Sequence, residues 1–174
     1  MATQIRRPSG NGPENNWDAS AGNNYDCVSD QSDATYVYRL SGSQANEMYS
    51  FPAFDISSSA ISGLTITVRH KDDDAAGSYI RHRIIVGGSI YYGDDVYPGA
   101  DWADLSYEWT TNPKTSAAWT EADIEGTGDN PLQYFGFRGN GDGSTNNCYC
   151  AEAYLTVTYT AATTGNPWYY YAQQ

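Results

Sequence analysis

Leu64-Thr65-Ile66-Thr67-Val68-Arg69-His70 is the stretch of the chain that decides its fold. Apolar and polar side chains alternate along it with a period of two, which is the pattern of a β-strand that buries one face. The closing stretch, 147–160, alternates in the same way. We therefore expect a β-sheet core that contains Leu64, Ile66, Val68, Leu155 and Val157.

Short alternating stretches, separated by turn residues, fill most of the remaining chain. Gly87-Gly88 marks a two-residue hairpin turn, and Thr120-Glu121-Ala122-Asp123 is a capping-box sequence that opens a short helix ending at Gly126. The expected strands are 24–29, 35–40, 47–51, 64–70, 79–86, 89–96, 105–111, 132–138 and 147–160. The pattern predicts an all-β fold, a two-sheet antiparallel β-sandwich of jelly-roll type with one short helix and extended N- and C-terminal arms.

The two ends of the chain differ from the middle. Residues 1–20 lack periodicity and are rich in Gly, Asn and Pro, so we expect an N-terminal arm before a sandwich domain of residues 21–160. Residues 161–174 form an aromatic C-terminal tail behind a Thr/Gly linker. Large aromatic side chains in sequence indicate a contact with a neighbouring subunit, and the rival interpretation is that the tail covers its own sandwich. The candidate interface residues are Pro167, Trp168, Tyr169, Tyr170 and Tyr171.

The charge of the chain excludes several kinds of partner. Nine Lys and Arg stand against 21 Asp and Glu, which gives a formal net charge of -12. A protein that binds nucleic acid directly needs basic residues to displace counterions from phosphate, so we expect no DNA or RNA partner.

The start of the chain lacks the apolar segment of a signal peptide, and no stretch approaches the roughly 20 apolar residues of a membrane span. We therefore expect synthesis in the cytoplasm and no membrane partner.

Three cysteines, Cys27, Cys148 and Cys150, are candidates for a disulfide. Strict alternation of the closing strand places Cys148 and Cys150 on the face that points away from the core. Two residues apart on one strand face, their Cα atoms lie about 6.5 Å apart with parallel side chains, which is a poor geometry for a mutual bond. Three readings stay open: three reduced thiols, a bond from Cys27 to Cys148 or Cys150, or a bond between subunits.

A tyrosine patch is the candidate for ligand binding. Tyr91, Tyr92 and Tyr97 lie next to Asp94-Asp95, and tyrosine offers a rigid contact surface with a polar tip, as in antibody loops. The alternative is that these side chains only stabilise the sheet through cross-strand pairs. The patch suits a sugar or a protein surface.

No residues point to catalysis, a metal or a cofactor. The oxygen-rich stretches at 72–74, 94–95 and 139–143 do not have the spacing of an EF-hand, so we interpret them as solvated turns. His70 and His82 each share a strand face with apolar residues, which is typical of core histidines. No nucleophile motif is present. We expect a protein that is not an enzyme and that uses no cofactor.

Between Trp17 and Tyr159 the chain resembles small β-sandwich proteins that tailed bacteriophages and prophages encode as virion or tail-associated structural proteins. The resemblance covers about four-fifths of the chain. It rests on the segments Asn23 to Asp30, Asp33 to Tyr38, Phe54 to Ile56, Ile66 to Lys71, Thr110 to Pro113, Ala118 to Ile124, Leu132 to Arg138 and Ala153 to Tyr159. The resemblance implies an assembly role and supplies no catalytic residues. The cysteine pair of the closing strand and the aromatic tail depart from the family pattern.

From the resemblance and the charge we expect a structural protein of a phage-like particle: a capsid decoration, collar or tail accessory that acts through contacts between subunits. Its partners would be further copies of the chain, other virion proteins, or both, and its location would be the virion. The alternative is an extracellular carbohydrate-binding or adhesin module, or the subunit of an extracellular filament.

Overall fold

The chain folds into two antiparallel β-sheets that pack face to face. The structure is a computed structural model that describes residues 1–39, 44–56, 60–73, 79–140 and 147–161. Sheet A contains β1 (Ala2–Arg6), β3 (Asp18–Ala19), β4 (Val37–Arg39), β6 (Ala60–Asp72), β9 (Ala103–Trp109) and β11 (Cys148–Thr160). Sheet B contains β2 (Gly10–Asn15), β5 (Ala45–Ser50), β7 (Tyr79–Val86), β8 (Ser89–Val96) and β10 (Leu132–Asn140). The predicted β-sandwich of jelly-roll type is confirmed.

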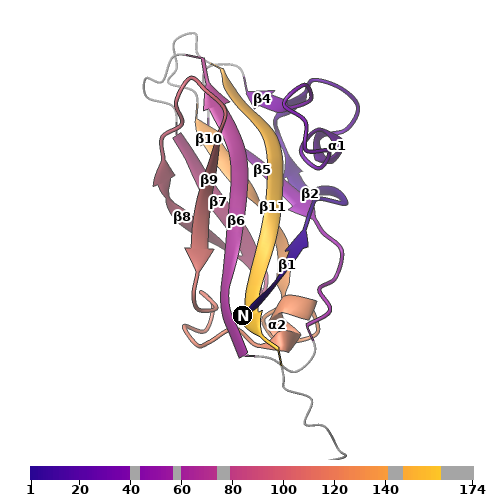
Figure 1. Ribbon diagram of the computed structural model, residues 1–174, viewed down its shortest axis with the longest axis vertical. Coiled ribbons are helices and arrows are strands. Elements are labelled where there is room, and N and C mark those ends of the chain that lie inside the picture. The colour runs from indigo at the N-terminus through magenta and orange to yellow at the C-terminus, as the bar shows by residue number, and fades with distance from the viewer. Residues whose placement is uncertain (40–43, 57–59, 74–78, 141–146, 162–174) are drawn as a thin grey trace, which may run out of the picture.

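The order of the strands places the first and the last described strands in the same sheet. Sheet A runs β3-β4-β11-β6-β9, with β1 also paired to β11, and sheet B runs β2-β5-β10-β7-β8. Figure 1 looks onto sheet A, where β6 and β11 lie side by side along the long axis and β1 follows the lower half of β11. The first strand and the last are therefore direct neighbours.

The hydrophobic core lies between the sheets, where the alternation of β6 and β11 placed it. The side chains of Leu64, Ile66, Val68, Leu155 and Val157 are fully buried, as predicted. The two histidines that share these faces, His70 and His82, are also fully buried. The Nε2 atom of His82 lies 3.0 Å from the carbonyl oxygen of Leu105, whereas both ring nitrogens of His70 lack a hydrogen-bond partner among the described residues. Burial lowers the pKa of His70 to about 3 and that of His82 to about 4, so both rings are neutral.

A bulge in β11 corrects the prediction for the late cysteines. The register of β11 against β6 shifts between Cys150 and Glu152, so Ala151 is an extra residue in the strand. The shift reverses the phase of the alternation, and Cys148 and Cys150 face the core while Tyr149 faces solvent. All three cysteines lie in the described part of the chain, where they are buried and form no disulfide.

The N-terminal residues are part of the sandwich, contrary to the expected arm. β1, β2 and β3 all lie within residues 1–20, and the Trp17 side chain is buried in the core. Its ring packs edge-on against Phe137, with centroids 5.0 Å apart, and its Nε1–H donates to the Ala45 carbonyl at 3.2 Å. Gly139 leaves the space for this ring, because a side chain there would collide with it. The Gly, Asn and Pro content of residues 1–20 is typical of a loop, so the edge strands β1 and β2 were not predicted.

Glu47 of β5 fixes this N-terminal segment from inside the core. Its carboxylate is fully buried and accepts hydrogen bonds from the Trp17 backbone N–H at 3.0 Å and from the Asn24 side-chain amide at 3.1 Å. The same Asn24 amide donates to the Trp17 carbonyl at 2.7 Å. These bonds draw Asn24 inward, and α1 (Asn24–Cys27) is a short helix where a strand over 24–29 was expected.

The predicted helix at Thr120 is confirmed. α2 (Glu121–Glu125) begins with a capping box in which the Asp123 backbone N–H donates to Thr120 Oγ1 at 3.1 Å and the Thr120 backbone N–H donates to the Asp123 carboxylate. Gly126 ends the helix with φ 80°, in the left-handed region that favours glycine. Across the described residues, no helix has the length and apolar character to span a membrane.

Candidate functional site

The described surface contains no pocket, so the candidate sites are the solvent-facing sides of the two sheets. The outer side of sheet B carries a group of tyrosine, arginine and acidic side chains, which we call the Tyr–Arg face. Its members are Glu14, Tyr79, Arg81, Arg83, Tyr92, Asp95 and Tyr97.

The strand register brings this face together. Arg83 of β7 pairs with Tyr92 of β8, and in the adjacent row Arg81 pairs with Asp95. On the other side of β7, Arg81 pairs with Arg138 of β10, which adds a third arginine. Alternate residues of one strand point to the same side of a sheet, so Tyr79, Arg81 and Arg83 all leave β7 on its outer side.

The Arg83 guanidinium packs against the ring of Tyr92. The guanidinium carbon lies over the Tyr92 ring, 5.1 Å from the centroid. Arg83 is only 1% exposed whereas Tyr92 is 39% exposed, so the tyrosine packs on a buried cation and keeps part of its surface in solvent. Arg83 Nη1 forms an ion pair of 2.7 Å with Glu14 Oε2, and Glu14 Oε1 accepts from the Asn46 amide at 3.0 Å. Because the guanidinium is anchored by Glu14, the Tyr92 ring is held in a fixed orientation.

Arg81 continues the face toward the end of β8. Its Nε and Nη2 atoms donate to the two carboxylate oxygens of Asp95 at 2.5 and 2.8 Å. This bidentate pair raises the pKa of Arg81 and lowers the pKa of Asp95, so both groups are charged. The guanidinium lies 5.8 Å from the ring centroids of both Tyr79 and Tyr92, and the Tyr79 and Tyr97 centroids are 6.4 Å apart. Rings and charged groups therefore alternate across the face.

Two of the three predicted patch residues lie on this face. Tyr92 and Tyr97 are exposed, at 39% and 66%, but Tyr91 points inward and packs against the core. The sequence analysis missed Arg81, Arg83 and Tyr79, although their spacing of two along β7 is a signal that could have found them. Glu14 was missed because residues 1–20 were interpreted as an arm. The interface candidates Pro167 to Tyr171 lie outside the described residues.

The described residues contain no group of three or more His, Cys, Asp or Glu side chains that could hold a metal ion. The three cysteines all lie in the hydrophobic core. Cys150 Sγ donates to the Glu152 carbonyl at 3.4 Å and Cys27 Sγ to the Ala21 carbonyl at 2.7 Å. The Ala153 backbone N–H donates to the Val28 carbonyl at 3.0 Å, which places the residue after Cys27 beside β11. Burial raises the pKa of Cys150, so this thiol stays protonated.

Comparison with known proteins gives a fold and no family. No protein family matches the sequence, and no curated protein sequence matches it either. Among solved structures, the chain is similar to a family 16 carbohydrate-binding module, with 13% identity, coverage of 72% of this chain and 78% of that chain, and a TM-score of 0.43. It is also similar to a family 11 carbohydrate-binding module of the cellulosomal cellulase Lic26A-Cel5E of Clostridium thermocellum, with 10% identity, coverage of 94% and 90%, and a TM-score of 0.40.

A third similar structure is the CBM36-1 domain of a multidomain xylanase from the hindgut metagenome of Trinervitermes trinervoides. Its identity is 11%, its coverage is 92% of this chain and 100% of that chain, and its TM-score is 0.37. At these values the likeness concerns the β-sandwich alone.

Proposed function

We propose that this chain is a non-catalytic carbohydrate-binding module whose ligand lies across the Tyr–Arg face of sheet B. The observation that carries the proposal is the Tyr92 ring, which packs against the buried Arg83 guanidinium and is itself 39% exposed. A sugar ring has two faces of C–H groups and a rim of hydroxyls. A flat aromatic surface with polar groups around it suits both parts of such a ligand.

The polar groups around Tyr92 match hydroxyl groups. A hydroxyl both donates and accepts a hydrogen bond, so its binding surface needs donors and acceptors side by side. Arg81 supplies N–H donors and Asp95 supplies carboxylate oxygens, and the side chains of both are about one-third exposed. The tyrosine hydroxyls of Tyr79 and Tyr97 add groups of both kinds.

The charge balance of the face favours a neutral sugar. Asp95 neutralises Arg81 and Glu14 neutralises Arg83, while the whole chain carries a net charge of -12. The two pairs are neutral and Arg138 adds one positive charge near Asp95, but an acidic polysaccharide would be repelled by the net charge of the chain as a whole. The absence of a pocket among the described residues suits an extended polysaccharide that lies along the sheet.

The test is binding of the purified chain to a panel of neutral and acidic soluble polysaccharides, measured by affinity gel electrophoresis and then by calorimetry. We expect a neutral polysaccharide to bind and Tyr92→Ala to weaken it by roughly fivefold or more, the effect of removing one central aromatic contact. Tyr154→Ala is the matched control, because Tyr154 is a half-buried tyrosine on the outer side of sheet A. Failure of every polysaccharide to bind, or equal binding by the Tyr92 variant, contradicts the proposal.

A structural role in a phage-like particle is our second proposal, and the aromatic run Trp168-Tyr169-Tyr170-Tyr171 favours it. Such a run can bury a large apolar area on a neighbouring subunit. Truncation after Thr164 tests this role by analytical ultracentrifugation and urea unfolding. A folded monomer that no longer assembles supports it. A truncated chain that assembles like the full chain but unfolds more easily shows instead that the tail covers its own sandwich.

A further inference from the structure

The outer side of sheet A carries a second group of aromatic side chains, at the end of the sandwich where β4, β6 and β11 meet. We call it the sheet A aromatic cluster, and its members are Tyr36, Tyr38, Trp102 and Tyr149. All four are partly exposed. The Tyr36 ring lies 5.3 Å from Tyr149, 6.1 Å from Tyr38 and 6.4 Å from Trp102, measured between centroids. The cluster exists because the bulge at Ala151 turns Tyr149 outward.

Lys71 places a positive charge on this cluster. Tyr149 pairs with Tyr38 on one side and with Lys71 on the other, so the three residues form one row across sheet A. The Lys71 ammonium lies 4.9 Å from the Trp102 ring centroid and 5.0 Å from that of Tyr149. Lys71 forms no ion pair with any described residue, so the two rings are the described partners of its charge. The molecule thus shows that these ring faces accept a cation.

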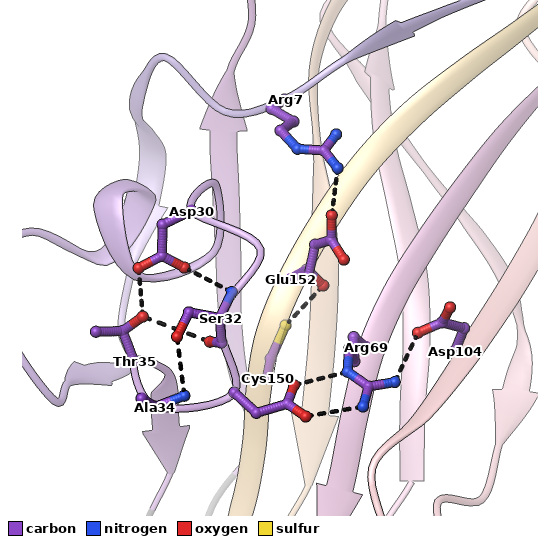
Figure 2. Close-up of polar contacts among 10 residues, drawn as sticks. Arg7, Asp30, Ser32, Ala34, Thr35, Arg69, Asp104, Cys150 and Glu152 are labelled. Carbon is purple, nitrogen blue, oxygen red and sulfur yellow. Dashed lines mark hydrogen bonds and ion pairs between the residues drawn. The ribbon is translucent and has the colours of Figure 1, made fainter.

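Acidic side chains surround the cluster. Arg69 is neutralised by Asp33, at 2.6 and 2.8 Å, and by Asp104 at 3.3 Å, and Figure 2 shows the guanidinium beside Asp104. The hydrogen bonds from Arg69 lower the pKa of Asp33, and the positive charge of Lys71 lowers it further. On the other side of the row, Asp73 accepts hydrogen bonds from the Tyr149 hydroxyl at 3.2 Å and from the Asn147 amide at 2.9 Å. Asp101, next to Trp102, is exposed.

We propose that the sheet A aromatic cluster is a docking surface for a basic segment of a partner protein, in which an arginine replaces Lys71 over the rings of Trp102 and Tyr149. Arginine stacks on aromatic faces more readily than lysine, because its planar guanidinium is more weakly hydrated. The acidic rim complements a basic segment and repels a second copy of this chain, which carries the same rim and a net charge of -12. Charge therefore decides between the two kinds of occupant.

The probe is the peptide acetyl-Arg-Gly-Arg-Gly-Arg-amide, titrated into the isotopically labelled full chain and followed by two-dimensional NMR. We expect the largest shifts at the Trp102 indole N–H and at the backbone amides of Lys71 and Tyr149, and we expect these shifts to weaken as salt is added. The same peptide with glutamate in place of arginine should cause none of them. Shifts spread evenly over the acidic residues of the whole surface would overturn the proposal.

A pair of charge-matched variants separates this site from general attraction. Lys71→Gln and Lys114→Gln each remove one positive charge, but Lys114 lies in the turn after β9 and donates to Ser89. We expect Lys71→Gln to bind the arginine peptide roughly two- to fivefold more tightly than Lys114→Gln, because it removes a competing cation from the rings. Trp102→Ala should weaken binding by a similar factor. Equal affinities of the two lysine variants would overturn the proposal, even if the Trp102 variant did not fold.

Discussion

Glu47 is the residue whose chemistry most directly couples pH to folding. Burial raises the pKa of this carboxyl from 4.5 to about 7, although the Trp17 backbone N–H and the Asn24 amide both favour the ionised form. The folded protein therefore binds the proton more tightly than the unfolded chain. The stability that Glu47 contributes is fully present below pH 4.5 and is lost as pH rises to 7, with a total change of about 3 kcal/mol.

The substitution Glu47→Gln tests this coupling, because an amide does not titrate. We expect the free energy of unfolding of the variant to rise relative to the native protein as pH increases from 4.5 to 8, by up to about 3 kcal/mol. Urea unfolding at a series of pH values measures it. Glu108→Gln, which removes a carboxylate at an exposed position, is the control. Parallel pH profiles for the native protein and the Glu47 variant would contradict the assignment.

The two core histidines act in the opposite direction. Their pKa values are lowered by burial, to about 3 for His70 and about 4 for His82, so the folded protein resists their protonation. The stability linked to their neutral forms is present above pH 6.5 and is lost as pH falls toward 4 and 3. The histidine and glutamate effects therefore oppose each other between pH 4.5 and 6.5, and the Glu47 variant is needed to separate them.

At the scale of elements, the sequence predicted the middle of the chain better than its ends. β7 and β8 have the predicted bounds, and the helix at Thr120 has the predicted cap. Alternation over several residues is a strong signal because one face of each strand meets the core. A bulge adds one residue without any change of composition, so nothing in 147–160 marks the reversal of phase at Ala151. The edge strands β1 and β2 contain only half-buried and exposed residues, so neither has the apolar face by which a strand is predicted from sequence.

The candidate site was predicted only in part, because the sequence does not show which strands pair or which side chains then share a face. Tyr92 and Tyr97 were found because tyrosines beside acidic residues suggest a binding surface. Tyr91 was included because the sequence does not reveal which of two adjacent tyrosines points outward. Arg83 was not considered, since the burial of an arginine under a tyrosine ring depends on the pairing of β7 with β8 and on Glu14 from a distant strand.

The bulge in β11 turns Cys148 and Cys150 into the core, so we expect their thiols to be unreactive in the native protein. Because Cys27, Cys148 and Cys150 are all buried, we expect none of them to react with Ellman's reagent in native buffer and all three to react in urea. Thr110→Cys, at an exposed position after β9, provides a thiol that should react at once. Rapid reaction of two native thiols would mean that Cys148 and Cys150 face solvent and that the strand has no bulge.

At the scale of the whole molecule, β1 completes sheet A. It pairs with β11 from Ala2 opposite Tyr159 to Arg6 opposite Leu155, and Arg7 adds an ion pair of 2.5 Å with Glu152, also visible in Figure 2. Deletion of residues 1–7 should lower the free energy of unfolding by about 2–4 kcal/mol, at roughly 0.5–1.5 kcal/mol for each lost backbone hydrogen bond. Urea unfolding measures this loss.

The same deletion should promote self-association, because the lower half of β11 becomes an unpaired edge. Size-exclusion chromatography at several concentrations follows it, with the full chain as the control. A deleted chain with native stability would show that β1 contributes nothing to the sandwich.

The position of β11 also governs the order in which the protein can fold during synthesis. β11 is the last strand of the described chain, yet it lies between β6 on one side and β1 and β4 on the other. Until β11 has been synthesised, β1 has no partner in sheet A, β4 pairs only with the two-residue strand β3, and the edge of β6 that faces β11 is unpaired. Contacts between residues as distant as Ala2 and Tyr159 give the fold a high contact order, which slows folding. Sheet A therefore closes only once β11 has been made, and a chaperone that shields the unpaired edge of β6 until then would raise the yield of folded protein.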